Sequence, residues 1–89
     1  MLARRAMAPE QAYHGLRHFQ PDAIRTLRTG FDNGLTEKKQ AAHVKKIAAE
    51  FSWPDWKLEM TLAAITWMAK NPTAGRIRWT EGEAYMFIE

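Results

Sequence analysis

Two histidines, His14 and His18, are the residues of this chain whose type and spacing come closest to a metal site. They are four residues apart, so on a helix both imidazoles lie on one face, as in helical zinc sites. The zincin pattern requires a glutamate directly after the first histidine, and this chain has Gly15 there. A third ligand would have to be His43 or Asp22, which only folding could bring near. We therefore expect no bound metal.

Side chains suited to enzyme catalysis are equally sparse. Asp55 and Glu59 are one helical turn apart, but carboxylates at this spacing are typical of a solvated surface. The sequence has no glycine-rich phosphate loop, no nucleophile elbow and no pattern of a Ser, His and Asp triad. Cysteine is absent, which excludes a disulfide scaffold, a thiolate zinc site and a cysteine nucleophile. These absences favour a protein that is not an enzyme and uses no cofactor.

The most informative pattern lies in the helix predicted from Pro54 to Lys70, which carries two apolar stripes. The first stripe, typical of an ordinary core, consists of Leu58, Leu62, Ile65 and Ala69. The second stripe lies nearly opposite and consists of Trp56, Met60, Ala63 and Trp67. The polar seam between them consists of Asp55, Glu59, Thr66 and Lys70. Because Trp and Met are common at binding surfaces, two interpretations stay open. Either neighbouring elements cover the second stripe, or Trp56, Met60 and Trp67 bind another protein or a second copy of the chain.

Basic side chains form a second type of candidate surface. The basic residues concerned are Lys38, Lys39, Lys45 and Lys46 on the third predicted helix and Arg76 and Arg78 near the C-terminus. The lysines and the two arginines can contact a phosphate backbone, and the aromatic Tyr85 and Phe87 beside those arginines can stack on single-stranded bases. Such faces are most often simply solvated. The order helix, helix, hairpin also fits a winged helix-turn-helix, but the helix from Pro54 is poor in residues that read bases.

Local signals predict four helices, which must position these residues. Pro9 and Pro21 suit the first turn of a helix, and Thr36 is a good N-terminal capping residue. The predicted helices span residues 9–19, 21–30 with a stop at Gly30, 37–51 and 54–70. In the first three, the residues expected in the core are Ala12, Leu16, Phe19, Ile24, Leu27, Val44, Ile47, Ala48 and Phe51.

Over residues 76–88 the apolar pattern alternates, which predicts a β-hairpin. A two-residue turn at 81–82 places Ile77 opposite Met86 and gathers apolar residues on one face. The competing interpretation is a helix that begins near Thr80.

Length and composition indicate one small domain. The chain has 89 residues, of which 46% are hydrophobic and 26% charged, as in globular proteins. We predict a mainly α (α+β) fold, a compact bundle of about four helices over residues 9–89 that ends in the hairpin at 76–88. We expect residues 1–8 to form a basic, loosely ordered segment.

The net charge is +3, and residues 1–30 hold five arginines against two acidic residues. No apolar run is long enough to span a membrane, and no secretory signal is recognisable. We therefore expect an intracellular protein, in the cytoplasm or, given the basic N-terminus, in mitochondria.

The leading interpretation is a small non-enzymatic protein–protein interaction module. It would act as an accessory subunit of a larger assembly or as an inhibitor that masks a partner surface. The expected partner is another protein or complex with an acidic surface, or a ribonucleoprotein. The alternative is a small basic nucleic-acid-binding protein with a winged-helix-like fold.

Overall fold

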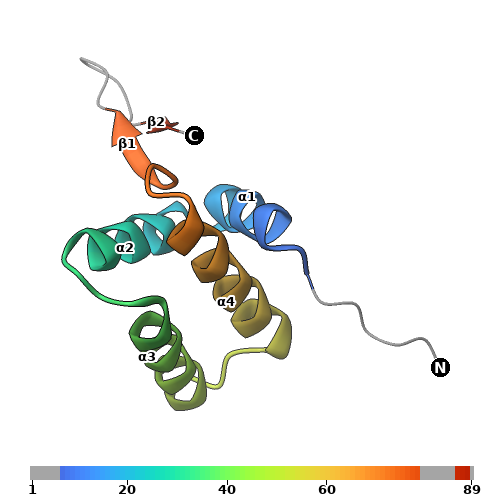
Figure 1. Ribbon diagram of the computed structural model, residues 1–89. Coiled ribbons are helices and arrows are strands. Elements are labelled where there is room, and N and C mark those ends of the chain that lie inside the picture. Colours follow the sequence, from blue (N-terminus) through green and yellow to red (C-terminus); the bar gives the residue numbers. More distant parts are fainter. Residues whose placement is uncertain (1–6, 79–85, 89) are drawn as a thin grey trace.

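Helices dominate the structure, a computed structural model that describes residues 7–78 and 86–88 (Figure 1). The helices are α1 (Pro9–Phe19), α2 (Pro21–Asp32), α3 (Glu37–Glu50) and α4 (Asp55–Lys70). Two short strands follow, β1 (Arg76–Arg78) and β2 (Met86–Ile88). The prediction of a compact, mainly helical fold with four helices is confirmed for the described residues. Most of the predicted basic segment 1–8 lies outside them. Within the described ranges, no helix is both long and apolar enough to cross a membrane.

The helices begin where local chemistry predicts. Pro9 and Pro21 stand at the start of α1 and α2, where a residue without an N–H loses no helical hydrogen bond. Thr36 caps α3, since its Oγ1 accepts a hydrogen bond of 3.1 Å from the backbone N–H of Lys39. Each of these three starts follows from interactions between residues close together in the chain.

The end of α2 differs from the prediction. The helix continues through Gly30 to Asp32. Gly34 supplies the left-handed residue that ends it, with a φ of 93°, and the N–H of Leu35 donates to the carbonyl of Gly30 at 3.0 Å. Gly30 is needed for packing instead, because a Cβ at this position would lie 2.6 Å from Oε1 of the buried Gln40.

Helix α4 lies at the centre of the fold and contacts each of the other three helices. Its buried residues are Thr61, Ala64, Ile65 and Met68. Thr61, Ala64 and Met68 occupy the sector between the two predicted stripes, on the side away from the polar seam, and Ile65 of the first stripe borders that sector. The half-buried residues on either side of this sector are Leu58 and Leu62 of the first stripe and Met60 and Trp67 of the second. The centre of the core on α4 thus lies beside the first stripe rather than on it, and both stripes are flanks of one broad buried face.

The other helices bury most of the residues expected in the core. Of that set the buried residues are Ala12, Leu16, Ile24, Leu27, Val44 and Ala48. Phe19 and Phe51 contradict the prediction, with exposed fractions of 59% and 68%. Phe19 is the last residue of α1, and Phe51 follows α3 just before Ser52, whose φ of 53° turns the chain. Tyr13 and Arg28 are buried although periodicity did not predict it.

Strands β1 and β2 pair antiparallel, with Ile77 opposite Phe87. The predicted turn places Ile77 opposite Met86 instead, so the observed register is shifted by one residue. Residues 79–85, which contain the predicted turn, lie outside the described part of the chain, and the hairpin as a whole stays a prediction.

Candidate functional site

Helix α1 packs along α4 and covers part of the second stripe. Cε of Met60 lies 3.5 Å from the position that a Cβ on Gly15 would occupy. One turn further along α1, the ring of Phe19 meets the ring of Trp56 edge to face, with 5.6 Å between the ring centroids. The two helices therefore run in opposite directions, and the end of α1 lies beside the beginning of α4.

The predicted partner-binding residues of α4 differ in exposure. Trp56 is at the surface, with 43% of its area exposed. Met60 and Trp67 are half-buried and pack against the hydrophobic core. Both interpretations of the second stripe thus apply to parts of it, since the protein's own packing covers much of Met60 and Trp67 but leaves Trp56 accessible.

Phe19 joins Trp56 at this surface, where sequence periodicity did not predict it. The spacing of Ala12, Leu16 and Phe19 favours a common buried face. Tyr13 is buried as well, however, and it shifts the centre of the buried face of α1 away from Phe19. The one sequence signal for exposure is the position of Phe19 at the end of the helix, directly before Gln20.

Polar residues flank the two rings on both helices. His18 precedes Phe19 and is exposed. Asp55 precedes Trp56, Glu59 lies one turn after it, and both are exposed. An apolar centre with a polar rim is the arrangement found in protein interfaces.

The lysines and the arginines of the predicted basic surface have different surroundings in the structure. The exposed lysines of α3 are Lys38, Lys39, Lys45 and Lys46. Arg76 lies 3.4 Å from Oδ1 of Asp32 and donates from Nε to the carbonyl of Pro72 at 3.3 Å. Its charge is therefore partly used within the chain, and the side chain of Arg78 lies outside the described part of the structure.

Arg28 is buried, although it belongs to the arginine-rich N-terminal third. Its Nη1 donates to the carbonyls of Ala74 at 2.7 Å and Asn71 at 3.1 Å. Its Nε lies 3.5 Å from Oδ1 of Asp32, and its guanidinium lies 5.4 Å from the centroid of the Phe31 ring. Burial lowers the pKa of Arg28, and the charge of Asp32 opposes that shift. This arginine attaches the segment after α4 to α2 and is not accessible to a partner.

The candidate metal ligands do not converge among the described residues. Nε2 of His14 lies 3.9 Å from Oε1 of Glu10, and its ring meets Tyr13 edge to face at 5.3 Å. His18 is exposed, and His43 lies on α3. Among the residues that the structure describes, no group of three or more His, Cys, Asp or Glu could hold a metal ion.

No protein-family model, curated protein or solved structure matches this chain. Its function is therefore inferred from the chemistry of its own surfaces. The aromatic pair and the lysines of α3 are the two features described so far that point to a partner.

Proposed function

We propose that this chain is a non-enzymatic protein–protein interaction module that docks on a partner protein through Phe19 and Trp56. The observation that carries this proposal is the pair of rings, 59% and 43% exposed, that two packed helices hold edge to face. Large aromatic side chains, Trp above all, are prominent among interface anchors because each buries a large apolar area. Since both helices are packed, the two rings lose little further freedom on binding.

The size of the effect follows from the exposed area. Complete burial of a large apolar side chain stabilises by about 1.5–3 kcal/mol. Phe19 and Trp56 leave about half of their area to be buried, so together they supply roughly 1.5–3 kcal/mol on docking. Micromolar affinity requires about 8 kcal/mol, so the partner must also contact the surrounding surface.

The proposed role is that of an accessory subunit in a larger assembly or of an inhibitor that masks a partner surface. The net charge of +3 favours encounter with a partner whose surface is acidic, which includes ribonucleoproteins. Trp56 remains an anchor predicted from the sequence and Phe19 is added, whereas Met60 and Trp67 are half-buried against the core.

The test is an affinity purification from the cell of origin with four forms of the full-length chain. These are the wild type, Trp56→Ala, Phe19→Ala and the control Leu35→Ala. Leu35 is also 43% exposed, and it lies in the connection between α2 and α3, far from the start of α4 (Figure 1). We expect Trp56→Ala and Phe19→Ala each to reduce the recovered partner by about three- to tenfold, and Leu35→Ala to retain it.

Circular dichroism establishes that the variants are folded, as expected for substitutions at exposed positions. Recovery of the same partner by Trp56→Ala and Phe19→Ala would contradict the proposal. Equal loss of the partner from Leu35→Ala would contradict it too, because binding would then not depend on the aromatic pair.

The exposed lysines of α3 support a second candidate function, a small basic nucleic-acid-binding protein. A winged-helix mode is disfavoured, because α4, its recognition helix, is packed at the centre of the fold. Binding through the lysines would fall steeply between about 50 and 200 mM salt. We expect the double variant Lys38→Glu with Lys45→Glu to bind nucleic acid more weakly than the wild type at any one salt concentration. Failure of the wild type to bind single- or double-stranded DNA or RNA at low salt rejects this function.

A further inference from the structure

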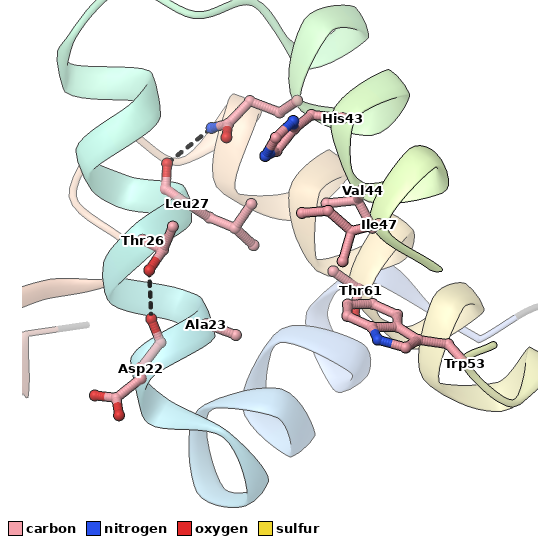
Figure 2. Close-up of a pocket in the computed structure, with 10 residues that line it drawn as sticks. Asp22, Ala23, Thr26, Leu27, His43, Val44, Ile47, Trp53 and Thr61 are labelled. Carbon is pink, nitrogen blue, oxygen red and sulfur yellow. Dashed lines mark hydrogen bonds between the residues drawn. The ribbon is translucent and has the colours of Figure 1, made fainter. Parts of the chain in front are cut away.

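Helices α2 and α3 form a groove because they touch near their connection and separate beyond it. Near the connection, Nε2 of Gln40 donates to the carbonyl of Leu27 at 2.8 Å, and the same side chain lies against Gly30. Beyond this contact a cavity of about 260 Å³ opens between the two helices (Figure 2).

The walls of this groove are apolar. Ala23 and Leu27 of α2 face Val44 and Ile47 of α3, and Trp53 lies at one end (Figure 2). The two threonine hydroxyls in the lining already donate to backbone carbonyls of their own helices, at 2.9 and 2.8 Å. The groove therefore offers mainly apolar contact to an occupant.

The edge of the groove on α3 is basic. His43 lines the groove, and the exposed Lys39 and Lys46 lie one helical turn to either side of it. Glu50, one helical turn after Lys46, lies on this edge as well and offsets part of its positive charge. On the α2 edge, Asp22 also lines the groove, but its carboxylate is turned away from the opening (Figure 2) and pairs with Arg25 of its own helix at 3.3 Å.

We propose that this groove binds an amphipathic helical segment of a partner protein, with apolar side chains in the groove and acidic side chains against Lys39 and Lys46. A volume of about 260 Å³ is below the ~300–1,000 Å³ of small-molecule pockets, and it fits one or two anchoring side chains of a larger molecule. Because the two lysines are positively charged, the flank of the bound segment that faces them is expected to be acidic. The groove does not include Phe19 or Trp56, so this inference goes beyond the proposed function and can fail separately from it.

The test uses a phage-displayed library of random peptides of about 16 residues, selected on the full-length chain. We expect the recovered peptides to carry apolar residues at helical spacing (i, i+3 or i+4, i+7) with Asp or Glu along one flank. Their affinities are then measured by fluorescence polarisation on the wild type and on variants.

The charge variant is Lys39→Glu with Lys46→Glu, which we expect to lower affinity about tenfold or more. Its matched control is Lys38→Glu with Lys45→Glu, which makes the same charge change at the same spacing. Helical periodicity directs Lys38 and Lys45 away from the groove, so the control should change affinity less than about threefold.

Ala23→Phe fills the groove and should abolish binding, whereas Ala42→Phe adds the same ring at an exposed position of α3 and should not. Trp56→Ala should leave peptide affinity unchanged, which separates this inference from the proposed function. Equal affinity for the wild type, Ala23→Phe and the Lys39/Lys46 variant would overturn the inference. Recovered peptides without the acidic amphipathic pattern would overturn it as well.

Discussion

Replacing Arg28 with methionine tests how the segment after α4 is attached to the helices. Methionine keeps an unbranched, flexible stem, so the main loss is the guanidinium group. The carbonyls of Asn71 and Ala74 then lose the donor that now lies 3.1 and 2.7 Å away. The ion pair with Asp32, 3.5 Å from Nε, is lost at the same time.

The magnitude follows from these contacts. Each hydrogen bond from a charged donor contributes about 1.5–3 kcal/mol, so two set an upper value of roughly 6 kcal/mol. The ion pair with Asp32, whose side chain is partly exposed, adds at most about 1 kcal/mol. Desolvation of the buried cation, which also lowers its pKa, is relieved in the variant and offsets a large part of this loss. We expect the free energy of unfolding to fall by about 3 kcal/mol, and Tm to fall by roughly 12–24 °C in a domain of this size.

Urea unfolding followed by tryptophan fluorescence measures this loss, because the chain contains four Trp residues. The matched control is Arg25→Met on the same helix, where the arginine is partly exposed and pairs with Asp22 at the surface. We expect that control to change the free energy of unfolding by less than about 0.5 kcal/mol. A loss below about 1 kcal/mol for Arg28→Met, or equal losses for the two variants, would refute the reasoning.

Three glycine-to-alanine changes should shift the free energy of unfolding in different directions, and thermal unfolding measures each shift. Gly15→Ala should stabilise by about 0.5–1 kcal/mol, because its Cβ would contact Cε of Met60 at an ordinary 3.5 Å; a destabilised variant would contradict this. Gly30→Ala should destabilise by about 1–2 kcal/mol, because it displaces the buried Gln40 from its hydrogen bond; unchanged stability would show that Gln40 adapts freely. Gly75→Ala should destabilise by about 2 kcal/mol or more, because its φ is 86° and its Cβ would lie 2.9 Å from a buried methionine; a Tm within error of the wild type would argue against it.

The starts of the helices could be predicted because they depend on neighbours in the chain. A proline in the first turn or a hydroxyl that accepts from an N–H three residues later acts over a few residues. Pro9, Pro21 and Thr36 accordingly begin or cap their helices as predicted. The end of α2 was harder to predict, because Gly30 and Gly34 both fit a local stop signal. Packing of Gln40, ten residues away, gives Gly30 a role inside the helix that no local signal indicates.

The candidate site could be predicted only in part. Periodicity correctly identified an excess of apolar residues on α4, with Trp56 among them. It could not show that Thr61, Ala64 and Met68 occupy the buried sector, because an element that is apolar on several sides fits several orientations. Phe19 was assigned to the wrong side for a related reason, since its own helix provides too few turns to define one face.

Local chemistry in this chain specifies where the helices begin and that α4 is apolar on two sides, because capping and periodicity act over one or two turns. The packed fold decides the rest: that Arg28 is buried, that Trp56 stays open beside Phe19, and that α2 and α3 separate into a groove. Each of these outcomes depends on residues far apart in the sequence, such as Arg28 with Ala74, and such burial is settled only when the helices pack together.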